Sequence, residues 1–221
     1  MIAVITADLL NSSKYSGELL TEVLDILKEE IEGIETKYKN SKFELYRGDS
    51  LQGIINPVSS FRSALRIKTA VNKLRSQEAV DSNSYRIEAD LRISIGIGEI
   101  EFERDSIMES NGEAFQFSGR TLDEMKKTGR KMILKTGIEE VNNEFDNVFL
   151  LFDTITDKWS SASAEVIYYL LKEMKEIEIA EALGISQSAV NQRKKAAGWD
   201  AILGLIERYE QVMKQHFIDG E

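Results

Sequence analysis

Two aspartates stand at places where acidic side chains can hold a metal ion. Asp8 ends the opening apolar run Met1-Ile-Ala-Val-Ile-Thr-Ala-Asp8, and Asp49 lies in the turn of segment 43–55. A carboxylate at a strand end and a carboxylate in a hairpin turn, separated by one long helix, can converge at one edge of a sheet. Such a pair suits Mg²⁺, which uses one or two carboxylates together with the phosphates of a nucleotide. The alternative is two ordinary turn aspartates, since Asp is common in turns.

The elements around the two aspartates follow from the hydrophobic pattern. A β-branched apolar run predicts a buried strand at 1–10, and helical spacing of apolar residues predicts an amphipathic helix at 17–38. Residues 42–48 and 50–56 are expected to form a hairpin around Asp49. Further helices are predicted at 59–77, 114–127 and 138–159, and strands at 87–100 and 132–135. This order predicts an α/β fold, a sheet with helices on one face.

The last third of the chain has a different pattern. From about Ser160 it is helical with short breaks, so we predict one domain at 1–159 and a small all-α domain at 160–221. The chain of 221 residues is long enough for two such domains. It has no cysteine and a single histidine, His216, which argues against disulfides, thiolate chemistry, a zinc site and a Ser-His-Asp triad.

Charge and hydropathy limit the classes of partner. The net charge of −10 disfavours loose, charge-driven binding to nucleic acid, so any DNA contact has to be local. No apolar run approaches the ~18 residues that span a bilayer, and the start of the chain lacks a basic segment of the kind found in signal peptides. We therefore expect a cytoplasmic protein with no membrane partner.

Residues 178–193 have the pattern of a helix-turn-helix. Ala180 is small where two helices would cross, Gly184 suits a left-handed turn, and Ser186 suits the cap of the next helix. The apolar residues expected to form the buried contact between the two helices, which we call the seam, are Ile179, Leu183, Ile185 and Val190. The small residue, the turn glycine, the capping serine and the apolar residues thus all indicate the same helix-turn-helix structure.

The second helix of this pattern would present polar side chains to DNA. The residues expected there are Gln187, Ser188, Asn191, Gln192, Arg193, Lys194 and Lys195. Gln, Asn and Arg read base edges, and lysines meet phosphates. A helical module for packing or dimerisation remains the alternative, because residues 160–221 hold seven lysines and arginines against ten acidic residues.

The predicted helix at 59–77 carries basic residues and no acids: Arg62, Arg66, Lys68, Lys73 and Arg75. A solvated basic face is the expected interpretation. A role in holding phosphates or nucleic acid is the alternative.

Four segments resemble motifs of class III nucleotidyl cyclases, in the same order and over residues 1–135. They are Thr6-Ala-Asp8-Leu-Leu-Asn-Ser-Ser13, Arg47-Gly48-Asp49-Ser50-Leu51, Leu91-Arg-Ile-Ser-Ile-Gly-Ile-Gly-Glu-Ile100 and Gly112-Glu-Ala-Phe-Gln-Phe-Ser-Gly-Arg120. In the cyclases these are the first metal-binding strand, the metal-binding hairpin, the strand after the second helix, and the helix with the transition-state asparagine and arginine. GGDEF domains and polymerase palms share this sheet. The whole chain resembles the SatD family of bacterial proteins.

The resemblance implies a palm-type, ferredoxin-like cyclase sheet followed by the helix-turn-helix domain. It implies that Asp8 and Asp49 bind Mg²⁺ or Mn²⁺ with a nucleoside triphosphate. Residues implied to hold the nucleotide are Ser12, Ser13, Arg47 and Gly48.

The resemblance also assigns two catalytic positions. Arg120 matches the arginine, and Gln116 stands where cyclases have asparagine. The partner subunit supplies this arginine in cyclases, so the resemblance implies a homodimer. We find no lysine–aspartate pair for reading a purine ring.

Two functions follow. The first is a DNA-binding regulator with a nucleotide- and Mg²⁺-binding, cyclase-like sensory domain. The alternative is an active Mg²⁺-dependent nucleotide cyclase or nucleotidyltransferase with a helical dimerisation tail. Gln116 and the missing purine-reading pair favour the first.

Overall fold

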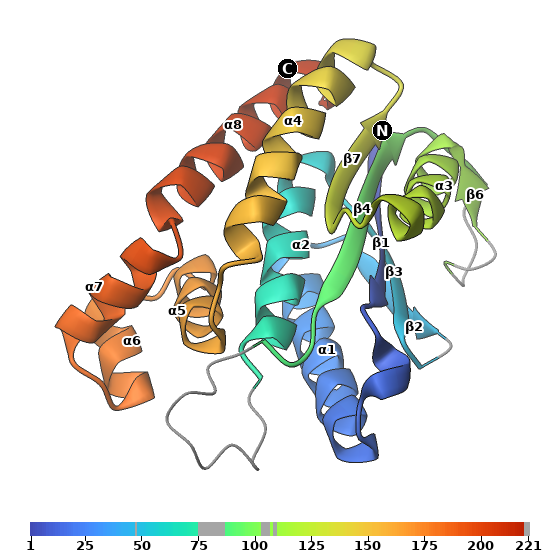
Figure 1. Ribbon diagram of the computed structural model, residues 1–221. Coiled ribbons are helices and arrows are strands. Elements are labelled where there is room, and N and C mark those ends of the chain that lie inside the picture. Colours follow the sequence, from blue (N-terminus) through green and yellow to red (C-terminus); the bar gives the residue numbers. More distant parts are fainter. Residues whose placement is uncertain (47, 75–86, 103–106, 108–109, 219–221) are drawn as a thin grey trace.

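The computed structural model describes residues 1–46, 48–74, 87–102, 107 and 110–218. Its main feature is a five-stranded sheet in the order β2-β3-β1-β4-β7 (Figure 1). The strands are β1 (Ile2–Leu9), β2 (Lys42–Tyr46), β3 (Ser50–Ile55), β4 (Leu91–Gly98) and β7 (Met132–Thr136). β1 is antiparallel to β3 and β4, and β4 is parallel to β7. The order β2-β3-β1-β4 is the ferredoxin-like arrangement, so the predicted α/β class is confirmed.

The helices lie close to the predicted positions. They are η1 (Ser12–Lys14, a 3₁₀ turn), α1 (Gly17–Lys37), α2 (Pro57–Asn72), α3 (Glu113–Thr128), α4 (Glu139–Thr156), α5 (Ser161–Leu171), α6 (Glu176–Leu183), α7 (Gln187–Ala196) and α8 (Trp199–Phe217). Two short strands, β5 (Ile100–Phe102) and β6 (Asn111–Gly112), form a pair that the sequence did not predict. No described helix is long and apolar enough to cross a membrane.

Two predicted elements have wrong bounds at both ends: the helix expected to reach residue 77 ends at Asn72, and the strand expected to reach residue 100 ends at Gly98. The helix expected from residue 59 begins at Pro57, because Pro is favoured in the first turn and the Asn56 side chain accepts a hydrogen bond from the Val58 backbone. The strand expected from residue 87 begins only at Leu91, where pairing with β1 starts.

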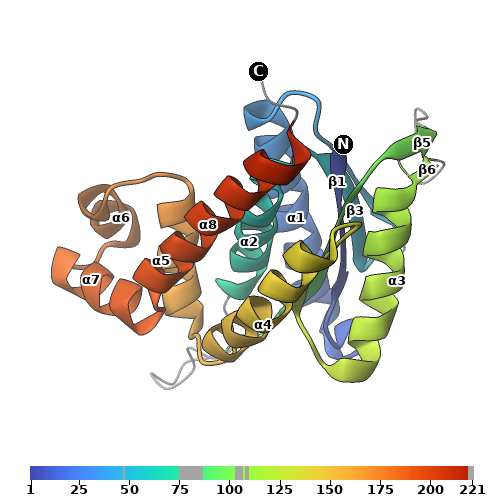
Figure 2. The same ribbon diagram turned by 90° about the horizontal axis from the view of Figure 1, so that it is seen from above.

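Helices cover both faces of the sheet, which corrects the expectation of one covered face. Ile93, Ile95 and Ile97 join the core that α1 and α2 complete, while the alternate residues of β4 face α3 (Figure 2). A Cβ atom on Gly96 would lie only 2.3 Å from the carbonyl oxygen of Ala114 in α3. Small residues on this face therefore let α3 approach the sheet closely.

Of the helices after residue 160, α5 and α8 share the core of the sheet. α5 and α8 pack on α2, and the ring of Tyr209 in α8 contacts those of Phe61 and Phe145. The buried hydroxyls of Tyr209 and Ser60 lie 2.7 Å apart. One hydrophobic cluster thus crosses the predicted boundary at 159/160, while α6 and α7 add a smaller cluster at the far side of α5. The two-domain division itself stays a prediction.

The basic residues of α2 do not form the solvated face that was expected. The Arg66 side chain is 5% exposed and its Nη2 lies 2.5 Å from Oε1 of the buried Glu30. Lys68 is 1% exposed and pairs with Asp90. Buried charges persist only when they are paired, and these partners come from other elements of the chain. Arg75 lies outside the described residues.

Candidate functional site

The strand end with Asp8 and the hairpin turn with Asp49 meet at one edge of the sheet. In the β1–β3 pairing Asp8 lies opposite Ser50, and the Leu9 backbone N–H donates to the Asp49 carbonyl at 2.9 Å. The Asp49 carboxylate accepts hydrogen bonds from the hydroxyls of Ser12 at 3.1 Å and Ser50 at 3.2 Å. The structure therefore brings Asp8, Asp49 and Ser12 together.

Two cations that the sequence analysis missed stand beside Asp8. Nη1 of Arg92 donates to the two Asp8 carboxylate oxygens at 3.3 and 3.1 Å, and Nζ of Lys126 lies 3.9 Å away. Burial raises the pKa of Asp8; Arg92 and Lys126 oppose this shift, and the negative charge of Asp49 adds to it. The alternation of Ile93, Ile95 and Ile97 was the available signal, because it places Arg92 on the opposite face of β4.

A hollow of about 310 Å³ opens between this sheet face and α3. Its lining residues are Thr6, Asp8, Tyr46, Ser50, Gln52, Gly119, Leu122, Asp123 and Lys126. The Gln52 side-chain amide donates to the Thr6 hydroxyl at 3.2 Å, and Thr6 donates to Ser118 at 2.9 Å. These bonds hold the polar wall of the hollow.

The donor set fits one hard dication with few protein ligands. No group of three or more His, Cys, Asp or Glu side chains suited to a metal occurs among the described residues. Mg²⁺ does not require one, since it commonly keeps waters and substrate phosphates as ligands. Around Asp49 the hydroxyls of Ser12 and Ser50 offer hard oxygen atoms. The Asp8 carboxylate, by contrast, already forms an ion pair with the Arg92 guanidinium.

Comparison with known proteins gives distant structural likenesses alone. No protein-family model and no curated protein matches the sequence. A bacterial light-regulated adenylyl cyclase matches with a TM-score of 0.43 and 14% identity over 60% of this chain, which spans 42% of that chain. The guanylyl cyclase Cya2 matches with a TM-score of 0.38 and 15% sequence identity; the match covers 56% of this chain and 69% of that chain. The guanylate cyclase domain of RhGC from Catenaria anguillulae, in complex with GTP, matches with a TM-score of 0.40 and 17% sequence identity. That match covers 55% of this chain and 71% of that chain.

The sheet itself has the ferredoxin-like strand order given above. On α3, which packs on this sheet, Gln116 is half-buried and Arg120 is exposed, and neither is among the residues lining the hollow at Asp8. Ser13 and Gly48 are exposed, the latter at a φ of 77° in the hairpin turn. Arg47 lies outside the described residues. The hollow is thus lined by Asp8 but by neither residue with an implied catalytic role, and the roles of all these residues stay predictions.

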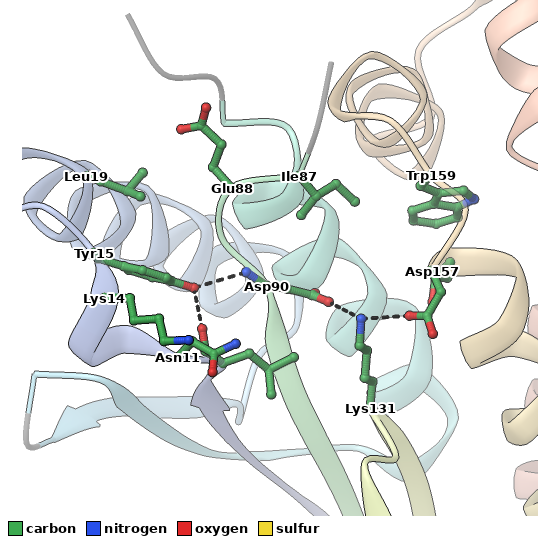
Figure 3. A pocket seen from close by; sticks show the side chains of 12 residues that line it. Asn11, Lys14, Tyr15, Leu19, Ile87, Glu88, Asp90, Lys131, Asp157 and Trp159 are labelled. Carbon is green, nitrogen blue, oxygen red and sulfur yellow. Dashed lines mark hydrogen bonds and ion pairs between the residues drawn. The ribbon is translucent and has the colours of Figure 1, made fainter. Parts of the chain in front are cut away.

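A partly buried ionic network supports the loop that carries Ser12. The Tyr15 hydroxyl donates to the Leu10 carbonyl at 2.8 Å and accepts from the Asp90 backbone N–H at 3.3 Å (Figure 3). Asp90 pairs with Lys131 at 2.9 Å, and Lys131 pairs with Asp157 at 2.7 Å. Burial would raise the pKa of Asp90, but the charges of Lys68 and Lys131 outweigh burial and lower it to about 2.

This network lines a second hollow of about 860 Å³, which sequence reasoning did not anticipate. It reaches Trp159, whose indole N–H donates to the Ala197 carbonyl at 2.9 Å. Ala197 caps the C-terminal end of α7. The hydrogen bond from Trp159 thus joins the edge of this hollow to the C-terminal end of α7, the predicted recognition helix.

The turn between α6 and α7 has the predicted geometry. Gly184 ends α6 at a φ of 63°, and the Ser186 hydroxyl accepts from the Ala189 backbone N–H at 3.2 Å. Ile179 and Val190 are fully buried in the seam. Figure 1 shows α6 and α7 standing away from the sheet, beyond α5.

The predicted DNA-contacting residues lie on an accessible helix. Gln187, Ser188, Gln192 and Lys195 are exposed, and Asn191, Arg193 and Lys194 are half-buried. Nζ of Lys194 lies 2.8 Å from Oε1 of Glu176, and the hydrogen bond from Lys194 lowers the pKa of Glu176. Nη1 of Arg193 lies 3.8 Å from Oε2 of Glu165. These acidic partners were not predicted, and a DNA phosphate would have to compete with them.

Proposed function

We propose that the protein is a DNA-binding regulator whose cyclase-like part binds a nucleotide with Mg²⁺ or Mn²⁺. The observation that carries this proposal is the α6–Gly184–α7 unit, whose apolar seam is buried while the polar face of α7 is accessible. The sequence resemblance to the SatD family and to the cyclase motifs supports the same combination of parts.

The composition of α7 supports specific rather than general binding to DNA. Its exposed residues Gln187 and Gln192 are base-reading side chains, and they lie near the N-terminal half that recognition helices insert into the major groove. The net charge of −10 opposes non-specific attraction to phosphates. Specificity therefore has to come from base contacts.

The nucleotide half of the proposal rests on Asp8, Asp49 and Ser12. Two carboxylates at adjacent strand ends would hold a divalent cation, and the loop at Ser12, which leads into α1, would face the phosphates. The cation would supply charge neutralisation of those phosphates. Arg92 and Lys126, both near Asp8, are additional cationic groups for the same ligand.

An active nucleotide cyclase or nucleotidyltransferase is the second candidate. The observation that favours it is the exposure of Arg120, since a surface arginine on α3 is available to the metal site of a second subunit. Incubation with ATP or GTP and Mg²⁺, followed by an assay of pyrophosphate release, separates the two functions. Sustained release that Arg120→Ala abolishes would favour the enzyme.

Selection from a random duplex pool at low salt, with and without ATP or GTP, tests the regulator. We expect enrichment of one sequence, and loss of that enrichment in Gln192→Ala. Gln211→Ala, an exposed glutamine of α8 away from the turn, is the matched control. A pool that is not enriched under either condition would refute DNA recognition.

A further inference from the structure

We propose that Arg92 competes with the divalent cation for Asp8, so that the metal binds tightly only together with an anionic ligand. This inference rests on the metal and nucleotide site proposed above, and it names the residue that regulates that site.

The contact between Arg92 and Asp8 is set by the backbone. The two residues are direct partners in the antiparallel β1–β4 register, with both side chains on the face toward α3. Directly opposite residues in such a pair have Cβ atoms ~5 Å apart, so they remain neighbours whatever the ligand. The Arg92 side chain is 14% exposed and that of Asp8 is 16% exposed, so water screens this pair only partly.

The Arg92 guanidinium is poorly satisfied in its present position. A single nitrogen, Nη1, serves both oxygens of Asp8, and the buried Nε has no hydrogen-bond partner among the described residues. Buried donors are normally paired, so this geometry is a weak use of a five-donor group. The guanidinium therefore has donors to offer to an incoming anion.

The two carboxylates are consequently unequal toward a metal ion. The described partners of Asp49 are the hydroxyls of Ser12 and Ser50, which are neutral and can stay beside a cation. The partner of Asp8 is a guanidinium, which repels a dication at hydrogen-bond distance. A cation that bridges Asp8 and Asp49 has to displace Arg92.

An anionic ligand removes this conflict. Phosphate oxygens accept bidentate hydrogen bonds from a guanidinium, so a triphosphate gives the displaced Arg92 a new partner. Lys126, whose side chain is 49% exposed and lies 3.9 Å from Asp8, can move to the same anion. Metal alone loses the Arg92–Asp8 pair without replacement, whereas metal with triphosphate replaces it.

Mn²⁺ titration followed by the electron paramagnetic resonance signal of free Mn²⁺ tests the proposal. The protein is the full chain, with and without non-hydrolysable α,β-methylene analogues of ATP and GTP. Because the phosphates of the analogue chelate Mn²⁺ themselves, each titration is compared with one that holds the same analogue and no protein. Relative to that reference, we expect weak Mn²⁺ binding without analogue and at least tenfold tighter binding with one. Arg92→Gln should bind Mn²⁺ at least tenfold tighter than the wild type without analogue, and the analogue should add little. Arg62→Gln, which removes an arginine paired with Glu210 away from the site, should resemble the wild type.

Two results would overturn the inference. The first is a folded Arg92→Gln protein with unchanged or weaker Mn²⁺ affinity; the second is equal enhancement by the analogue in wild type and variant. If Arg92→Gln does not fold, Arg92→Lys is measured beside the wild type. Because this variant keeps a cation at position 92, the analogue should still enhance its Mn²⁺ affinity at least tenfold, and loss of that enhancement in both proteins would overturn the inference. Asp49→Asn distinguishes failure of this inference from failure of the proposed metal site. If the Mn²⁺ affinity of Asp49→Asn equals that of the wild type, the metal site itself is refuted. The DNA selection remains an independent test of the regulator.

Discussion

Asp90 shows how one buried carboxylate organises the strand ends near the site. It accepts hydrogen bonds from Lys68, Asn72 and its own neighbour's backbone N–H at Leu91, and it pairs with Lys131. Charge-assisted bonds of this kind are stronger than neutral ones. The start of β4, with Arg92 two residues further on, is thereby fixed relative to β7 and α2.

The depressed pKa of Asp90 predicts a specific loss of stability in acid. Its folded-state pKa is about 2, against 3.8 in the unfolded chain, so its stabilisation is complete above the unfolded value and disappears as the pH falls toward the folded value. A shift of this size corresponds to about 2 kcal/mol. Urea unfolding should show Asp90→Asn to be destabilised at neutral pH, with a shallower decline between about pH 4 and pH 2 than the wild type.

Asp25→Asn is the control for this measurement, because Asp25 is exposed on α1 and pairs with the equally exposed Lys28 in an i,i+3 contact. Its unfolding free energy should follow that of the wild type at each pH. Parallel acid profiles for Asp90→Asn and the wild type would contradict the assignment.

At the scale of elements, the α6–α7 turn depends on one left-handed residue. Gly184 has a φ of 63° and open space where a Cβ atom would lie, so Gly184→Ala meets no clash and tests backbone strain alone. Such strain costs about 1 kcal/mol for an L-residue. Gly204→Ala is the matched control, since Gly204 lies inside α8 with equal space, and alanine there should stabilise by ~1 kcal/mol. Chemical denaturation that gives both variants the same sign would contradict this.

The ion pair between Lys194 and Glu176 predicts opposite effects on DNA affinity. Lys194→Ala should weaken binding to all sequences and reduce the salt slope by about one, because a phosphate contact is lost. Glu176→Gln should strengthen binding, because it releases Lys194 from its 2.8 Å partner. Fluorescence anisotropy on the selected duplex at several salt concentrations measures both. Glu207→Gln, an exposed acid of α8, controls for the change in net charge.

Arg193, on the same helix, is predicted to contact a base rather than a phosphate. Arg193→Ala should cost about 1–3 kcal/mol on the selected site if the side chain is bidentate to guanine, and little on random duplex. Equal losses on both duplexes would assign Arg193 to phosphate binding instead.

Local sequence patterns predicted most helices and strands, because the periodicity of apolar residues in a helix or strand involves only residues close together in the sequence. Partners brought together from distant segments were less accessible. Lys68 was expected in solvent because its partner Asp90 follows 22 residues later. Likewise, the face covered by α3 is marked only by small residues such as Ser94 and Gly96. The convergence of Asp8 and Asp49 was predictable from turns; the insertion of Arg92 depended on the β1–β4 register.

At the scale of the whole molecule, the position of Arg120 bears on assembly. It is exposed on α3 and does not line the hollow at Asp8, so we expect it to act on a nucleotide bound by a second chain, as the cyclase resemblance implies. Recognition of two DNA half-sites also favours a two-fold dimer. Sedimentation at micromolar concentration should therefore give a species of twice 25.0 kDa, at least with nucleotide. A monomer with and without nucleotide would count against both arguments.

The seating of α8 on α2 also has a consequence during protein synthesis. Tyr209 is fully buried against Phe61 and Phe145, residues made much earlier. Chains emerge from the ribosome N-terminus first, so the side of these rings that Tyr209 covers stays open to water until residues 199–217 have been released. Chaperones and proteases recognise such exposed apolar surface. A prematurely terminated chain that lacks α8 would therefore be marked for removal by its own uncovered aromatic rings.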